Sequence, residues 1–123
     1  MKPLDLNTIL SFEKRFDGFR GGEIFSIEIV TPKTIKLFLN VQDSLKGFDW
    51  IGLEFLFEDV IDAKLIENEK LHLLNMPDGF TFLKQDGIFA FACDKYKNID
   101  GTKNALCYII SKSVKYSQKN AKI

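Results

Sequence analysis

Residues 49–66, DWIGLEFLFEDVIDAKLI, form the longest apolar run of the chain and contain its only tryptophan. If these residues formed a helix, Ile51 and Phe55 would lie off its apolar stripe. Gly52 would lie in the helix interior, at a cost of roughly 0.5–1 kcal/mol relative to alanine. A strand instead places four large side chains on one face: Ile51, Leu53, Phe55 and Phe57. We therefore expect strand rather than helix, broken at Glu58 and Asp59, with a second strand over 60–66.

The rest of the chain predicts one short helix followed by more strands. Residues 5–16 have helical apolar spacing, and Asp5 can cap that helix. Alternation of apolar and polar residues predicts further strands over 23–30, 34–41, 70–74, 80–84, 88–93 and 105–116. In the first of these we expect Phe25 to share one face with Ile27 and Ile29.

These elements predict a single domain over 1–123, of the mainly β (α+β) class. The helix 5–16 precedes an antiparallel β region over 23–116 and a frayed tail over 117–123. Short connections, such as Asp86-Gly87 between two apolar strands, make sequential strands antiparallel. We expect a curved antiparallel meander, half-barrel or sandwich of about seven or eight strands, with the N-terminal helix covering one face or end.

Composition argues against several broad classes. The chain has 123 residues and a formal net charge of zero, from 17 basic and 17 acidic residues. A general nucleic-acid binder needs a surplus of lysine and arginine, so we expect no nucleic-acid partner. No apolar run approaches the ~20 residues that span a membrane, and the first residues carry no signal-peptide pattern. We therefore expect a cytoplasmic protein without membrane contact, whose two cysteines are in a reducing compartment.

Charge is distributed unevenly along the chain. Residues 42–70 hold eight acids and three lysines, whereas residues 94–123 hold seven lysines and two aspartates. This asymmetry either gives the protein a charged surface for a partner or reflects ordinary solvated faces. The sequence leaves both interpretations open.

Residues suited to catalysis are sparse. His72 is the only histidine, and nothing in the sequence fixes a cysteine or serine beside it. Glu54 and Glu58 share a strand face about 13 Å apart, too far for a glycosidase-type pair within one strand. One histidine and two separated cysteines give no zinc-site spacing. We therefore expect no catalytic residue, no metal and no cofactor.

The two cysteines have a geometric relation. A hairpin turning about Asp100-Gly101 places Cys93 almost opposite Cys107, with Cβ atoms about 4.5–5.5 Å apart. The pair is then either two buried thiols or a disulfide, and the sequence leaves both states open.

Binding has more support than catalysis. The strand faces opposite the inward rows carry Phe38, Trp50 and Leu56, interleaved with Glu54 and Glu58. An aromatic anchor ringed by charge is typical of a protein interface. Either the N-terminal helix covers this second face or another molecule does.

The chain combines a short helix, Phe16-Asp17-Gly18 with a glycine loop, an alternating strand, Trp50-x-x-Leu53-x-Phe55 running into Asp59-Val60, and then β-hairpins. This layout resembles that of small bacterial all-β immunity proteins of contact-dependent growth inhibition and related toxin systems. The resemblance implies a protein that binds and blocks one cognate toxin, often a nuclease with a basic active site.

On this interpretation an acidic, aromatic-anchored surface covers a basic toxin domain, because charge complementarity raises the association rate and selects the partner. The predicted contact residues are Trp50, Glu54, Glu58, Asp59, Asp62 and Phe38. A small apolar-ligand or lipid-binding protein is the first alternative, since the chain is rich in phenylalanine. An enzyme with an unrecognised site around His72 is the second. A monomer and a homodimer are both compatible with the sequence.

Overall fold

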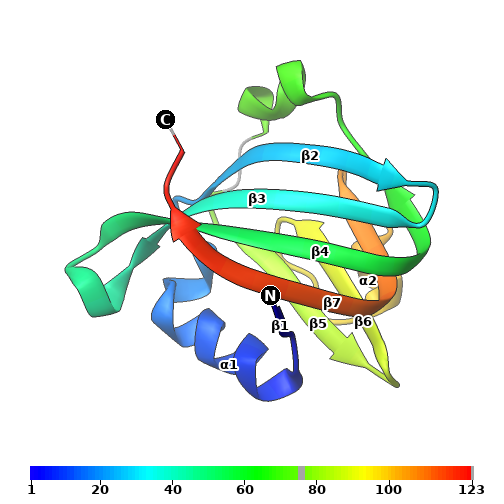
Figure 1. The fold of residues 1–123 in the computed structure, drawn as a ribbon, viewed down its shortest axis with the longest axis horizontal. Helices are drawn as coiled ribbons and strands as arrows, with labels where there is room; N and C mark the ends of the chain where they lie inside the picture. Colours follow the sequence, from blue (N-terminus) through cyan, green and yellow to red (C-terminus); the bar gives the residue numbers. More distant parts are fainter. Residues whose placement is uncertain (75–76, 123) are drawn as a thin grey trace.

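The computed structural model describes residues 1–74 and 77–122 and shows one curved antiparallel sheet with one main helix (Figure 1). In this part of the chain the sheet has seven strands and is not closed into a barrel. The elements in chain order are β1 (Lys2–Pro3), α1 (Leu6–Arg15), η1 (Asp17–Phe19), β2 (Glu23–Thr31), β3 (Thr34–Asp43), η2 (Ser44–Lys46), β4 (Asp49–Lys64), η3 (Asn68–Leu73), β5 (Phe80–Gln85), β6 (Ile88–Cys93), α2 (Ile99–Thr102) and β7 (Tyr108–Asn120). The predicted mainly β class with an N-terminal helix is confirmed.

The strand order across the sheet is β2-β3-β4-β7-β6-β5. β7, the last strand in chain order, therefore inserts between β4 and β6 and joins two antiparallel units, β2-β3-β4 and β5-β6. One side of β7 pairs with β4 over its whole length, from Lys64 back to Ile51. Its other side is shared by β6 and the short β1. All of these pairings are antiparallel. Short connections predicted this for strands that follow one another in the chain, but not the pairing of β7 with β4 and β1.

β4 is one strand of 16 residues rather than the two strands predicted for 49–66. At the expected break Asp59 has a φ of 53°, and a β-bulge follows at Ile61, where the register against β7 shifts between Val60 and Asp62. Aspartate tolerates this left-handed conformation better than most residues. The strand continues beyond the bulge because β7 runs alongside and keeps pairing with it.

The sheet curls so that its two units pack on each other through phenylalanine rings. The ring centroids of Phe55 on β4 and Phe82 on β5 are 4.7 Å apart, although two strands separate β4 from β5 in the sheet. Phe57 and Phe91 meet across the same interior at 6.3 Å. All four side chains are buried, and we call the surface that they share the inner face. Ring pairs of this kind stabilise a core beyond their buried area.

Helix α1 packs against the inner face. Its N-terminus is capped by Asp5, whose Oδ1 accepts a hydrogen bond from Thr8 N–H at 2.7 Å. Ile9 and Phe12 are its buried residues, and the Phe12 ring lies 6.5 Å from that of Phe55. Because α1 covers the inner face, it does not cover the opposite face of β2, β3 and β4, which was one of the two predicted arrangements.

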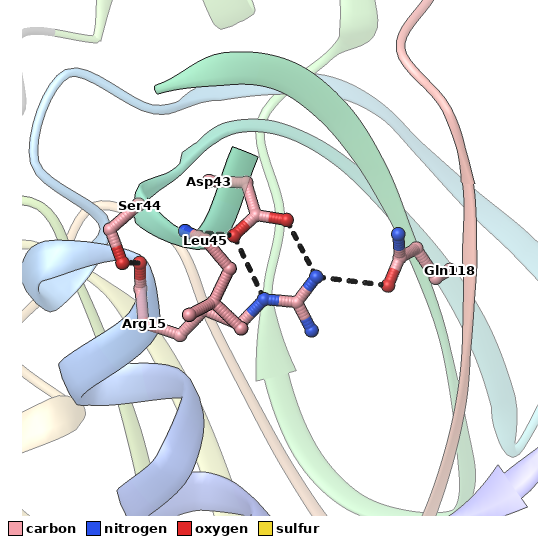
Figure 2. A network of polar contacts seen from close by, with 5 residues as sticks. All are labelled: Arg15, Asp43, Ser44, Leu45 and Gln118. Carbon is pink, nitrogen blue, oxygen red and sulfur yellow. Dashed lines mark hydrogen bonds and ion pairs between the residues drawn. The ribbon is translucent and has the colours of Figure 1, made fainter. Parts of the chain in front are cut away.

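An ion pair anchors the C-terminal end of α1 to the connection between β3 and β4 (Figure 2). Arg15 donates from Nε to Asp43 Oδ1 at 2.9 Å and from Nη2 to Asp43 Oδ2 at 2.6 Å. The Asp43 side chain is fully buried and also accepts from Leu45 N–H at 3.0 Å. Arg15 Nη2 donates to Gln118 Oε1 at 3.3 Å, and Ser44 Oγ donates to the Arg15 carbonyl at 2.6 Å. The hydrogen bonds from the guanidinium lower the pKa of Asp43, and the same contact raises the pKa of Arg15.

The strand predicted for 70–74 is wrong. These residues lie in or directly after the 3₁₀ turn η3, because only Leu71 is a buried anchor there and Leu73 is exposed. One apolar anchor fixes a single turn but does not define a strand face. Asn68 Oδ1 accepts from Ile27 N–H at 2.9 Å, so η3 covers part of the free edge of β2.

The frayed tail predicted for 117–123 is also wrong as far as Asn120. β7 begins at Tyr108 and ends at Asn120, later at both ends than the predicted 105–116. The polar residues after 116 are held in the sheet because β4 offers them backbone partners as far back as Ile51. Residue 123 lies outside the described residues.

Candidate functional site on the outer face of the sheet

The outer face of the sheet is set by the register of its long strands. Phe38 on β3 lies opposite Glu54 on β4, which lies opposite Ser117 on β7. Alternation then defines the outer face as Ser26, Glu28, Lys36, Phe38, Asn40, Trp50, Gly52, Glu54, Leu56, Glu58, Ser113, Lys115, Ser117 and Lys119. Four of the predicted contact residues lie on this face: Phe38, Trp50, Glu54 and Glu58.

The other two predicted contact residues, Asp59 and Asp62, do not join the outer face as one acidic set. Asp59 has a left-handed φ of 53°, and the register shift between Val60 and Asp62 separates Asp62 from Glu58. Asp62 Oδ2 accepts a hydrogen bond from Tyr108 Oη at 3.0 Å. Burial and, secondly, this hydrogen bond raise the pKa of Tyr108. The bulge thus divides the predicted carboxylates into two groups.

The acidic and the lysine-rich segments of the sequence lie side by side in the fold. The acidic segment 42–70 contains β4, the lysine-rich segment 94–123 contains β7, and these two strands pair directly. Lys115 Nζ lies 3.2 Å from Glu58 Oε1, with both side chains partly exposed. Acids of one strand and lysines of the other therefore alternate on a surface of mixed charge.

The surroundings of Trp50 are not uniformly acidic. Trp50 lines a shallow groove together with Lys46 and Lys119. It also lines a second groove, which includes Glu23 and Lys122. The predicted aromatic anchor is thus present, but its neighbours carry both signs of charge.

Phe38 is not available to a partner in this structure, since only 2% of it is exposed. Gly52 on β4 makes room for its ring: a Cβ at Gly52 would lie 2.4 Å from Phe38 Cζ. The Phe25 ring stands edge-on at 5.9 Å, and Lys122 Nζ lies over the ring at 4.4 Å. Phe25 on the neighbouring strand and Lys122 in the segment after β7 therefore cover Phe38, and helix α1 does not.

Phe25 was predicted on the same face as Ile27 and Ile29, and that assignment is wrong. The register between β2 and β3 shifts between Ile24 and Ser26. This irregularity turns Ile24 to the inner face, where it is buried, and leaves Phe25 on the outer side against Phe38. A strict two-residue alternation could not reveal it.

A hollow of the outer face lies beside Trp50, and we call it the Trp50 groove. It has a volume of about 670 Å³ and is lined by Glu23, Phe25, Asn40, Trp50, Asn120, Ala121 and Lys122. Trp50 is 45% exposed and Phe25 is 41% exposed, so two large aromatic side chains border it with much of their surface in water. Of these lining residues the sequence predicted only Trp50 as a contact residue.

Asn40 forms the polar floor of the Trp50 groove. It is buried, and its Nδ2 donates to the Lys122 carbonyl at 2.7 Å while its Oδ1 accepts from Lys122 N–H at 3.0 Å. Both halves of the amide are therefore satisfied by one residue of the segment that follows β7. No spacing in the sequence signals this pairing, because 82 residues separate the two partners.

His72 lies in a different hollow, of about 430 Å³, between β2 and η3. Glu23, Phe25, Asn68 and Leu71 also line it. An enzyme would be favoured by a cysteine or a carboxylate within hydrogen-bond reach of His72. Neither cysteine borders the hollow, and Glu23, which does, makes no hydrogen bond with His72 in the described part of the chain.

Cys93 and Cys107 are adjacent, as the hairpin geometry predicted. Cys93 N–H donates to the Cys107 carbonyl at 3.0 Å. Both cysteines are buried and free rather than joined in a disulfide. Burial raises the pKa of Cys93, and raises the pKa of Cys107 to about 12. Neither thiol is therefore a ready nucleophile near neutral pH.

Comparison of the chain with models of protein families, with curated proteins and with solved structures found no significant match. Within residues 1–74 and 77–122, no group of three histidine, cysteine, aspartate or glutamate side chains is placed to hold a metal ion. Over the same residues, no helix has the length and apolar character needed to cross a membrane.

Proposed function

We propose that this protein is a non-catalytic binding protein that contacts another protein through the Trp50 groove. The observation that carries the proposal is the exposure of the only tryptophan, 45%, at the rim of a groove that a second exposed aromatic residue, Phe25, also borders. Tryptophan is the residue type most enriched among side chains that dominate binding energy at protein interfaces.

The outer face around the groove has the composition of an interface rim. Glu23 and Lys122 line the groove itself, and Lys46 and Lys119 line the hollow next to it, so exposed charges of both signs border the aromatic residues. Charged residues at a rim contribute little affinity but select partners and orient them during association. An aromatic centre with a polar rim therefore supports a protein partner.

The inner face supports this proposal over an apolar-ligand carrier. Phe55 contacts the rings of Phe12, Phe57 and Phe82 at centroid distances of 6.5, 6.4 and 4.7 Å. These side chains fill the space between the two units of the sheet and leave it as packed core. Lipid-type ligands need an open apolar cavity there.

The narrower function, neutralising a cognate toxin as an immunity protein, stays a prediction from the resemblance in layout. The mixed charges of the outer face give it no separate support, because a basic toxin domain would meet lysines as well as acids. Reversing the charges with Glu54→Lys and Glu58→Lys tests it. Weaker binding to the partner is expected where the partner surface is basic, whereas unchanged binding argues against a basic toxin domain.

A site-specific crosslinking experiment tests the proposed function. The photoreactive amino acid p-benzoylphenylalanine replaces Trp50 in one variant and Leu106, an exposed residue in the loop before β7, in a control variant. In cells of the organism that encodes the protein, we expect one discrete protein adduct from position 50 and none of that mass from position 106. The same pattern at both positions, or no adduct from position 50, contradicts the proposal.

The captured partner then allows a quantitative comparison. We expect Trp50→Ala to weaken binding by about 2 kcal/mol or more, roughly thirtyfold in Kd, because a tryptophan at an interface centre is a typical hot spot. Leu106→Ala should change Kd by less than about twofold. Equal Kd values for the two variants would remove the Trp50 groove from the interface.

A further inference from the structure

We propose that the Trp50 groove is a binding site for an extended peptide that carries a basic side chain, and that the chain's own Lys122, at the edge of the groove, takes the basic-residue position in this structure. The inference rests on the proposed function and specifies the chemistry of its partner. Two features carry it: a buried amide that recognises a peptide backbone, and an aromatic seat that holds an ammonium group.

The backbone feature is the side chain of Asn40. Its amide donates to the carbonyl and accepts from the N–H of the same residue, Lys122, at 2.7 and 3.0 Å. Two neighbouring strands form this same reciprocal pair of bonds in an antiparallel ladder. Any residue type other than proline can supply both groups, so Asn40 selects an extended backbone and not a particular side chain.

The side-chain feature is the pair of rings beneath Lys122. Its Nζ lies 4.4 Å from the ring centroid of Phe38 and 5.6 Å from that of Phe25. Glu23 lines the same groove and adds a negative charge. Aromatic faces attract lysine ammonium and arginine guanidinium groups, so the seat accepts either basic side chain.

The segment that fills the site is held by few contacts. The ladder between β4 and β7 ends with the pair Ile51 and Asn120, and Lys122 lies beyond it with an exposed side chain. The Asn40 hydrogen bonds and the two ring contacts are its anchors in the groove. A peptide of the same chemistry can therefore take its place and reach the exposed ring of Trp50 beside it.

The test opens the aromatic seat in the full chain with Lys122→Ala, which leaves residue 122 only its backbone hydrogen bonds to Asn40, so that a probe carrying the ammonium group competes with it for this position. The probe is Nα-acetyl-lysine methylamide, which offers one peptide residue with both backbone groups and an ammonium. Binding is followed by the NMR signals of the Asn40 side-chain amide and by the fluorescence of Trp50, the only tryptophan. Lys119→Ala, a lysine of the outer face that does not contact the rings, is the matched control.

We expect the probe to bind Lys122→Ala at concentrations about two- to fivefold lower than the wild type or Lys119→Ala, as the cation–ring attraction predicts. Nα-acetyl-norleucine methylamide, which keeps the aliphatic chain but lacks the charge, should bind more weakly by a similar factor. Adding Asn40→Ala to Lys122→Ala should abolish the response. Thermal unfolding of each variant confirms that it is folded.

Three results would overturn the inference: no response of Lys122→Ala to the probe, equal responses of Lys122→Ala and Lys119→Ala, or equal binding of the lysine and norleucine probes. Because the norleucine comparison uses Lys122→Ala alone, the test holds even where the double variant fails to fold. The two proposals fail separately. If position 50 gives a crosslinked adduct but the probe does not bind, the proposed function is supported and the peptide site is refuted. If the probe binds but no adduct forms, the peptide site is supported and the proposed function is refuted.

Discussion

The Arg15–Asp43 ion pair allows the most quantitative test of how the fold is held together. Asp43→Asn keeps the size of the side chain and an acceptor for Leu45 N–H, but it removes the negative charge opposite the guanidinium. Arg15 then keeps its positive charge but no longer has a carboxylate as its partner. Removing one partner of a buried ion pair typically costs 3–5 kcal/mol, because the remaining charge is left uncompensated.

The structure places the expected cost below that range. Arg15 keeps 22% of its side chain exposed, and Gln118 Oε1 still accepts one of its hydrogen bonds, so the guanidinium retains part of its solvation. We expect Asp43→Asn to lower the free energy of unfolding by about 2–3 kcal/mol at pH 7. With an unfolding entropy of about 2.1 cal/mol/K per residue, this loss corresponds to roughly 8–12 °C in Tm for a chain of this length.

Urea unfolding followed by circular dichroism measures the change. Glu58→Gln is the matched control, because its pair with Lys115 is partly exposed and should contribute less than about 1 kcal/mol. A double-mutant cycle with Arg15→Gln separates the pair energy from the effects of each single change. We expect the largest coupling energy between Arg15 and Asp43. A loss below about 1 kcal/mol for Asp43→Asn, or no coupling in the cycle, refutes the reasoning.

The pH dependence gives the same pair an independent test. Because the hydrogen bonds from Arg15 lower the pKa of Asp43 in the folded protein, its contribution is fully present above the ordinary aspartate pKa of about 3.8. It is lost as the pH falls through the lower, folded-state pKa. The stability difference between wild type and Asp43→Asn should therefore stay constant from neutral pH down to about pH 5 and narrow below about pH 4. A difference that persists unchanged in acid contradicts this origin.

Three further changes have defined expectations. Gly52→Ala should cost about 1–3 kcal/mol in urea unfolding, because its Cβ would lie 2.4 Å from Phe38 Cζ; an unchanged midpoint would show that the ring moves freely. Phe55→Ala should cost about 3–5 kcal/mol by the same assay, since the side chain is fully buried among other rings, and a cost below 1 kcal/mol would contradict the packing described. Iodoacetamide at pH 8 should label Cys93 and Cys107 only after unfolding, because both are buried and have raised pKa values; mass spectrometry showing rapid labelling of the native protein is the opposing outcome.

Where one physical cause acts alone, the sequence is a good guide to this fold. Helix α1 follows from helical spacing and the Asp5 cap, and both are observed. The hairpin at Asp86-Gly87 is also observed, with φ values of 53° and 76° at these two residues that suit its tight turn. The adjacency of the two cysteines follows from the same arithmetic of hairpin register.

The errors occur where a tertiary partner overrides the local pattern. Residues 117–120 are polar and predict a frayed end, but β4 supplies them with backbone partners. The left-handed Asp59 and the bulge after Val60 interrupt alternation in the same way as a turn does, and only continued pairing with β7 distinguishes the two. The irregularity beside Phe25 moves that ring to the other face without any change in composition.

The candidate site was predictable only in part. Trp50 was identified because an aromatic residue among charges on an outward row has no internal reason to be there. Asn40 and Lys122 were missed because their contact joins distant parts of the chain through hydrogen bonds that any sequence could supply. The charge asymmetry along the sequence suggested an acidic surface for a related reason. The acids of β4 and the lysines of β7 become neighbours only when the two strands pair.

The insertion of β7 between β4 and β6 also affects folding during synthesis of the chain. On the ribosome, β2, β3, β4, β5 and β6 are all synthesised before the strand that joins them exists. Until β7 is synthesised, no common sheet buries the phenylalanine side chains of the two units. Exposed apolar segments of a nascent chain bind chaperones and aggregate at high concentration. We expect the emerging polypeptide to stay chaperone-bound until β7 is released, and to fold slowly for its size, because its central pairings connect residues far apart in the chain.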